Sequence, residues 1–182
     1  TTNSITNTTT NKKQAPKVEK KQESKQEEVK VEEQAKAEEQ ISEEKEEPKF
    51  NMPVSGEIIR EFAVDSLVYS NTLEEWITHN GIDIKADKTS VVTAAAPGKV
   101  YAIKNDPRYG LTVIIDHDNG YRSIYSNLLT AEFVVEGENV EQGQTIGTVG
   151  NSSTFEISDD CHLHFELLKD NEYVDPTIYI NS

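Results

Sequence analysis

Two short stretches of the chain carry residue types that bind metals or move protons. The stretch CHLHFEL places His162 and His164 one residue apart, and the stretch HNGIDI places His79 four residues before Asp83. In an extended strand alternate side chains share a face, so the first two histidines point the same way. Two imidazoles and one carboxylate make an open zinc site, in which water takes the fourth position. The two stretches together therefore predict a metal site.

The spacing within HNGIDI limits how its histidine and aspartate can meet. Fully extended, their Cα atoms would lie roughly 13 Å apart, too far for one small ion unless the backbone bends. Gly81 permits such a bend. From the residues alone, His162 or His164 can supply the second imidazole, and zinc fits these ligand types best among the common ions. The alternative is that the His-x-His pair only packs or lies on the surface.

Two regions of different composition make up the 182 residues. Residues 1–49 contain no Gly, Phe, Tyr or Trp and consist mainly of Thr, Asn, Lys, Glu and Gln. Such a segment cannot bury enough apolar surface to offset the entropy lost on ordering. We therefore expect residues 1–49 to be a charged leader, disordered or transiently helical, and residues 50–182 to form one folded domain.

The formal net charge of −15 argues against binding to nucleic acid, which needs clustered cations. Lys and Glu nearly balance in the leader, so the excess acid lies in the folded part, where a positively charged partner surface would complement it. Cys161 is the only cysteine, which excludes an internal disulfide. No apolar run reaches the roughly 18 residues that would span a membrane. Because the chain begins with Thr, we expect a signal or membrane anchor to have preceded it.

The pattern of residues 50–182 predicts short strands separated by turns. Pro97-Gly98 lies between two apolar runs, and Asn119-Gly120 is a strong hairpin signal. Only NTLEEWIT, residues 71–78, has helical character. We therefore predict a mainly β domain, a small antiparallel sandwich or partly open barrel.

Several further motifs make the chain similar to the LytM-like, or lysostaphin-type, zinc endopeptidases that cut peptidoglycan. The resemblance runs from about Phe50 to Pro176. Its motifs are MPVSGEI, HNGIDI, VVTAAAPGKV, LTVIIDHDNGYRSIYSNL, VEQGQTIGTVGNSS, CHLHFEL and YVDP. The resemblance implies that His79, Asp83 and His164 hold one zinc ion. It also implies that His162 is a catalytic or substrate-orienting histidine.

Two departures from that family pattern affect catalysis. The family has Tyr-x-His-Leu after the hairpin, whereas this chain reads YSNL, with Asn127 in place of a second catalytic histidine. An amide cannot accept and return a proton at neutral pH, and loss of a general acid or base costs about a hundred- to ten-thousand-fold in rate. In addition, NSSTFEISDDC replaces a Gly/Thr-rich groove loop with a longer, acidic one. We expect hydrolysis to be weak or absent.

The sequence also leads to expectations for His117, Cys161 and Trp76. His117 lies in the hairpin and is expected to be structural. Cys161 alternates away from His162 and is expected to pack in the interior. Trp76, three residues before His79, can wall a groove, form part of a lid or pack in the core.

Two functions remain open at this point. In the first, a catalytically degenerate domain keeps zinc for structure and binds a protein partner, as the sporulation members of this family do between the forespore and mother-cell membranes. That interpretation implies an extracytoplasmic location and a forespore-membrane anchor. In the second, the domain is an active or slow zinc endopeptidase acting on peptidoglycan.

Overall fold

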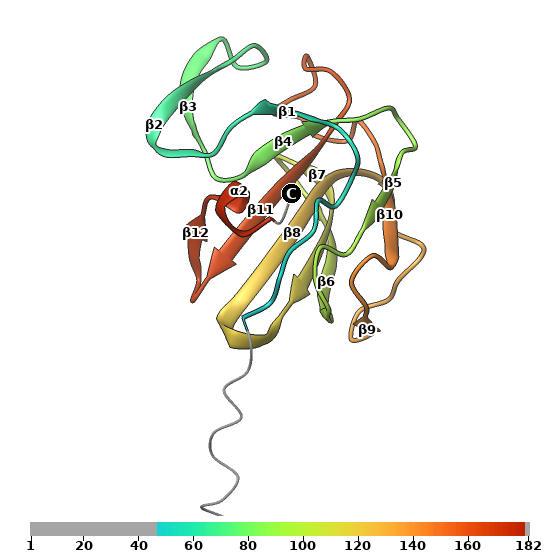
Figure 1. Ribbon diagram of the computed structural model, residues 1–182. Helices are drawn as coiled ribbons and strands as arrows, with labels where there is room; N and C mark the ends of the chain where they lie inside the picture. Colours follow the sequence, from blue (N-terminus) through green and yellow to red (C-terminus); the bar gives the residue numbers. More distant parts are fainter. Residues whose placement is uncertain (1–46, 181–182) are drawn as a thin grey trace, which may run out of the picture. The chain divides into compact units, whose positions relative to one another are not determined.

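The computed structural model describes residues 47–180, and nearly all its regular structure is β (Figure 1). The predicted leader, apart from residues 47–49, lies outside the described residues. The strands are β1 (Glu57–Arg60), β2 (Ala63–Ser70), β3 (Glu75–His79), β4 (Ile82–Lys85), β5 (Val91–Thr93), β6 (Gly98–Asp106), β7 (Gly110–Asp116), β8 (Tyr121–Thr130), β9 (Asn139–Val140), β10 (Thr145–Val149), β11 (His162–Lys169) and β12 (Glu172–Val174). A short 3-10 turn, η1 (Asp118–Gly120), and a short helix, α2 (Pro176–Tyr179), complete them.

Ten of these strands form one sheet, and each pairing between named strands is antiparallel. Its main path runs β1-β4-β11-β8-β7-β6-β9, with β12 beside β11 and with β10 paired to both β5 and β8. Strands β2 and β3 form a separate hairpin, visible at the upper left of Figure 1. The prediction of a mainly antiparallel β domain is confirmed.

Local turn chemistry explains where the strands end. Asn119 and Gly120 both have positive φ, 57° and 77°, which is the conformation that an Asn-Gly hairpin turn requires. They join β7 to β8, as the sequence predicts. The prediction of helical character over residues 71–78 is wrong beyond the first turn: Glu74, with φ 56°, ends it, and β3 follows because it pairs with β2.

Strand β11 has one apolar face, which packs in the core, and one face that carries the metal-binding residue types. Leu163, Phe165 and Leu167 are buried in the hydrophobic core. The alternate residues His162, His164 and Glu166 are buried on the opposite face. This alternation follows from the period of two in a strand. The polar face of β11 is therefore the floor of the candidate site.

The chain closes with a single helical turn. Pro176 begins α2 and the Asp175 side chain accepts a hydrogen bond from the Thr177 backbone N–H, which is a capped helix start. Within residues 47–180, no helix has the length and apolar character needed to cross a membrane.

Candidate metal centre

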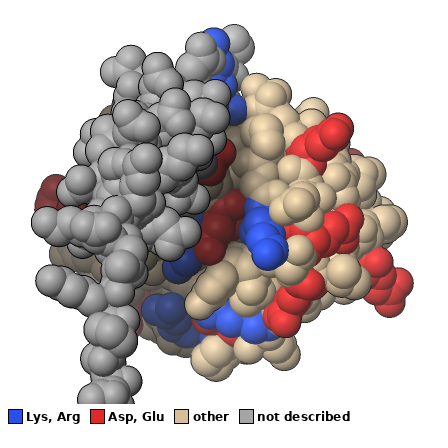
Figure 2. Space-filling model, turned by 90° about the horizontal axis from the view of Figure 1, so that it is seen from below, with Lys and Arg blue, Asp and Glu red and all other residues tan. Residues whose placement is uncertain are grey.

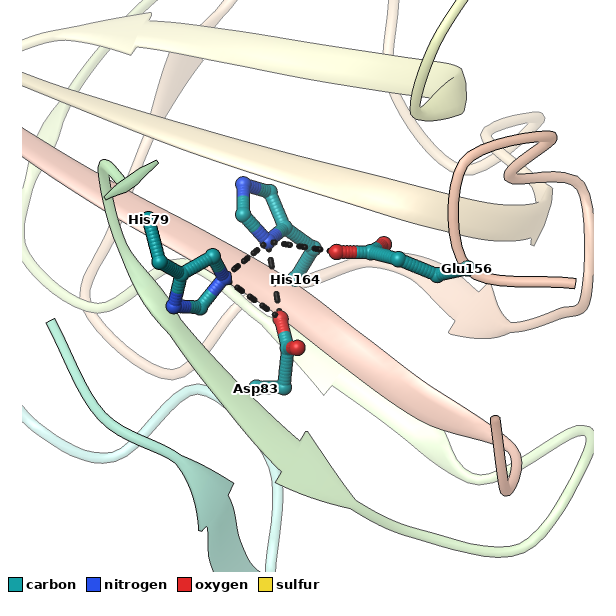
Figure 3. A group of neighbouring side chains, drawn as sticks. All are labelled: His79, Asp83, Glu156 and His164. Atoms are coloured by element: carbon teal, nitrogen blue, oxygen red, sulfur yellow. Dashed lines mark hydrogen bonds and ion pairs between the residues drawn. The ribbon is translucent and has the colours of Figure 1, made fainter. Parts of the chain in front are cut away.

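The structure brings together the three residues predicted to bind metal. Asp83 on β4 is the register partner of His164 on β11, and His79 ends β3. His164 Nδ1 lies 2.8 Å from Asp83 Oδ1, while His79 Nε2 lies 3.2 Å from both atoms (Figure 3). The pairing of β4 with β11 and the bend between β3 and β4 therefore bring the three residues together, although His164 is far from the other two in the sequence.

Gly81 lies in that bend. A Cβ atom at this position would lie 2.3 Å from the carbonyl oxygen of Phe165, far inside contact distance. The glycine is therefore required by the close approach of the bend to β11. This contact explains why a larger residue there would displace β4 and, with it, Asp83.

Hydrogen bonds on the outer side of each imidazole orient the inner nitrogens. His79 Nδ1 lies 2.8 Å from the carbonyl oxygen of Glu61, and His164 Nε2 lies 3.2 Å from a carboxylate oxygen of Glu166. Because both partners only accept hydrogen bonds, each outer nitrogen carries the proton. The inner nitrogens face each other beside the Asp83 carboxylate and can present lone pairs to a bound ion; without an ion, His164 Nδ1 carries a proton and donates it to Asp83 Oδ1. The converging nitrogens and carboxylate thus need a cation between them, a proton or a metal, and the donor set fits a metal ion.

The pKa values of the centre point in the same direction. Burial alone raises the pKa of the Asp83 carboxyl, but hydrogen bonds and charge from His164 and His79 hold that pKa well below its usual range. Burial lowers the pKa of the His164 imidazole, but its hydrogen bonds to Asp83 and Glu166 outweigh burial and raise this pKa to about 10. The pocket therefore favours positive charge at its centre.

Glu156 is a fourth member of this group that the sequence did not single out. One ligand atom from each of His79, Asp83, Glu156 and His164 lies within 4.8 Å of the others. Glu156 comes from the acidic loop before β11. The acidity of that loop was visible in the sequence, but nothing in it distinguished this glutamate from the two aspartates that follow.

Arg60 on β1 balances part of the negative charge. Its Nη1 donates to Asp83 Oδ2 at 2.9 Å and to Glu156 Oε1 at 3.3 Å, and its Nη2 donates to Asp159 at 2.8 Å. Burial lowers the pKa of the Arg60 guanidinium, but the charge of Asp83 and the other carboxylates outweighs this and raises it. A single cation thus connects β1, β4 and the acidic loop.

Tyr109 covers another side of the centre. Its ring stacks on the His164 imidazole, with centroids 4.1 Å apart and planes 5° from parallel. The Asp106 side chain accepts hydrogen bonds from the backbone N–H groups of Arg108 and Tyr109, which holds this turn in place. Burial raises the pKa of the Tyr109 phenol well above its usual value, so the ring is neutral.

The positions of His162 and Asn127 bear directly on catalysis. Asn127 Nδ2 donates to the backbone oxygen of His162 at 3.0 Å, and Asn127 Oδ1 accepts from the backbone N–H groups of Ser152 and Ser153 at 2.7 and 2.9 Å. Burial lowers the pKa of His162, but Glu156 and Asp83 outweigh it and raise that pKa. The amide of Asn127 is thus committed to holding β11 and the start of the acidic loop.

The other residues considered in the sequence lie outside the group formed by His79, Asp83, Glu156 and His164. His117 is bonded to the carbonyl of Pro97 and the hydroxyl of Ser123, each at 2.7 Å. Cys161 is half-buried just before β11, so the expectation that it packs in the interior is wrong. Trp76 is 65% exposed on the β2–β3 hairpin, where its ring contacts Tyr69, and this excludes a core role.

Comparison with known proteins assigns the chain to a family. Residues 77–176 match peptidase family M23, the family of the LytM-like domains, and the chain belongs to it. The matched segment contains His79, Asp83, Glu156 and His164.

Individual relatives within the family include sporulation proteins and peptidases. Stage II sporulation protein Q of Bacillus subtilis (strain 168) is 32% identical over 117 residues, which are 63% of this chain and 40% of that protein. A structure of the SpoIIQ–SpoIIIAH pore forming complex matches with a TM-score of 0.64 and 25% identity, covering 74% of this chain and 92% of that one. A zinc containing peptidase from Vibrio cholerae matches with a TM-score of 0.61 and 28% identity over 70% of this chain and 39% of that one. The chain spans less than half the length of the curated relatives it matches.

Proposed function

We propose that this chain is a zinc-binding, catalytically degenerate M23 domain that acts by binding a protein partner. In this proposal His79, Asp83 and His164 hold the zinc ion. The domain works in the space between the forespore and mother-cell membranes during engulfment, held by a forespore-membrane anchor. Its partner resembles SpoIIIAH, the protein in complex with SpoIIQ in the similar structure.

The observation that carries this proposal is the environment of Asn127. The amide faces His162 from the position where the family resemblance implies a second catalytic histidine. Both of its polar atoms already hold backbone groups, so it is part of the scaffold. It has no basic nitrogen with which to exchange a proton during peptide hydrolysis.

The β2–β3 hairpin is the surface that best suits a protein partner. It carries three exposed large apolar side chains, Leu67, Tyr69 and Trp76, and its strands pair only with each other among the described residues. Exposed apolar residues together with free strand edges suit strand addition and aromatic anchoring by a second protein. Figure 2 views the domain from below Figure 1, away from this hairpin, and shows both acidic and basic side chains there, so the charge of that face does not by itself select a basic partner.

A binding experiment combined with a hydrolysis assay tests the proposal. The full chain should bind the SpoIIIAH-type protein of its own organism and should release no fragments from purified peptidoglycan. Trp76→Ala should weaken binding by about tenfold or more, as expected for an interface aromatic. The control Tyr101→Ala removes another exposed aromatic, on β6, and should leave binding unchanged. Strong peptidoglycan cleavage, or no binding by the wild type, would reject the proposal.

The second candidate function is slow zinc-dependent cleavage of peptidoglycan peptides. The convergence of His79, Asp83 and His164, with His162 alongside, favours it. Zinc held in this way supplies an activated water and polarises a carbonyl. His162 would then be the only imidazole beside the ligands able to move protons, since Asn127 cannot replace the second one.

A further inference from the structure

The loop between β10 and β11 carries a buried glutamate into the metal centre. Glu156 is only 3% exposed, although its loop lies between two strands at the edge of the site. Glu156 Oε1 lies 3.7 Å from His164 Nδ1, and Figure 3 shows the carboxylate pointing toward the two histidines and Asp83. Burial of a glutamate is costly unless its charge is compensated by partners.

Specific contacts hold this carboxylate in place. The Ser153 hydroxyl lies 3.1 Å and His162 Nε2 lies 3.2 Å from Glu156 Oε2, while Arg60 donates to Oε1. Asn127 fixes the preceding turn by accepting the backbone N–H groups of Ser152 and Ser153. The residue that replaces a catalytic histidine therefore also anchors the loop that delivers Glu156.

The carboxylates around Arg60 carry more charge than this one arginine compensates. Asp83, Glu156 and Asp159 all accept from its guanidinium, and His162 and His164 face Asp83 and Glu156 from the other side. A buried excess of negative charge is unfavourable without further cations, which are protons on these imidazoles in the metal-free protein. A divalent metal ion between Asp83 and Glu156 would supply the same compensation.

Four ligand atoms lie close enough together to approach four-coordinate binding, all within 4.8 Å of one another. Zinc bonds of about 2.0 to 2.2 Å in a tetrahedron place neighbouring ligand atoms roughly 3.3 to 3.6 Å apart. The measured separations are 2.8 and 3.2 Å among the histidines and Asp83, and 3.7 Å between His164 and Glu156. Four protein ligands characterise structural zinc sites, whereas hydrolytic sites keep one position for water.

We infer that Glu156 is a fourth protein ligand and takes the coordination position that a hydrolytic zinc centre leaves to water. The inference rests on the proposed binding of zinc by His79, Asp83 and His164. It deepens that proposal, because it makes the centre a closed, structural one. Hydrolysis is then blocked twice, by the closed metal position and by Asn127.

Cobalt substitution tests whether the fourth position is open. The full chain is loaded with Co²⁺, whose visible absorption reports coordination, and is then titrated with azide, which replaces a metal-bound water. The variants are Glu156→Ala, which opens the position, and Glu156→Gln, which keeps the shape and most hydrogen bonds if the alanine variant fails to fold. The matched control is Asp159→Ala, since Asp159 belongs to the same loop and the same arginine but lies outside the metal group.

The inference predicts a clear difference between the proteins. The wild type and Asp159→Ala should bind one Co²⁺ with a spectrum that azide does not change. Both Glu156 variants should still bind the ion, with affinity lowered about tenfold or more in a chelator competition, and their spectra should shift with azide. A wild-type spectrum that responds to azide as strongly as the variants overturns the role of Glu156 while leaving zinc binding intact. Absence of bound metal in the wild type overturns the zinc proposal itself, and the ligand role with it.

Discussion

The histidines of the metal centre and His117 occupy surroundings of opposite character within the same sheet. His164 and His162 face carboxylates, and the pKa of each is raised despite burial. His117 faces a carbonyl and a hydroxyl beside the ring of Phe50, and burial lowers its pKa in spite of that carbonyl. The imidazoles of the metal centre thus lie in surroundings that favour positive charge, whereas the surroundings of His117 keep its imidazole neutral. The surrounding acceptors, rather than the imidazole, separate a candidate metal site from a structural histidine.

The largest expected effect comes from removing a ligand. His79→Ala and Asp83→Ala should each lose zinc, because each removes one of the three donor atoms that lie within 3.2 Å of one another, whereas Glu156 is farther out, 3.7 Å from His164. The fall in affinity should exceed the roughly 10- to 100-fold that loss of an outer partner costs. His117→Ala should keep its zinc. Metal content after gel filtration measures the difference, and full retention in both ligand variants would refute the assignment.

A smaller effect is expected from the outer carboxylate of His164. Glu166→Gln keeps the shape but weakens the hydrogen bond that orients Nε2, so zinc affinity should fall about 10- to 100-fold. Glu172→Gln changes an exposed glutamate on neighbouring β12 and serves as the control. Chelator competition measures both affinities. Equal affinities for the two variants would show that Glu166 does not support the metal.

A fifth histidine at position 127 tests whether one additional imidazole is enough to make the centre hydrolyse peptidoglycan. Asn127→His should remain without peptidoglycan release, and its free energy of unfolding should fall by about 1 to 3 kcal/mol because buried backbone N–H groups lose their acceptor. Asn139→His, at an exposed position on β9, should change stability by no more than about 0.5 kcal/mol. Urea unfolding and a fragment-release assay measure the two properties. Strong cleavage by Asn127→His would show that one imidazole is all the site lacks.

The smallest effect concerns the pH dependence contributed by His117. Its pKa in the folded chain lies below the ordinary value of 6.5, so the unfolded chain takes up the proton more readily. The stability it contributes is therefore present above about pH 6.5 and is lost as pH falls through the folded-state pKa. In His117→Gln the free energy of unfolding should therefore change less over this pH range, by about 1 kcal/mol or less. Urea unfolding of metal-free protein at several pH values measures it, and an unchanged slope would contradict the prediction.

Much of the fold follows from local sequence. The Asn119-Gly120 turn and the alternation within CHLHFEL depend on neighbouring residues, and both are present as predicted. At residues 71–78 the pairing of β3 with β2, a long-range condition, outweighs the local helix-forming residues, so the helical turn stops at Glu74. The surroundings of Trp76 do not follow from local sequence either, because its exposure depends on where the hairpin lies.

The β class and the residue types of the candidate centre follow from the sequence, and the family resemblance implies that Asn127 stands where a catalytic histidine is expected. That Glu156, rather than a neighbouring acid, enters the centre and that Arg60 joins it to Asp83 follows only from the folded chain. These contacts join residues far apart in the sequence, through a loop without a repeating pattern. The path of that loop is set by hydrogen bonds to Asn127, which become visible only once β8, β10 and β11 are in place.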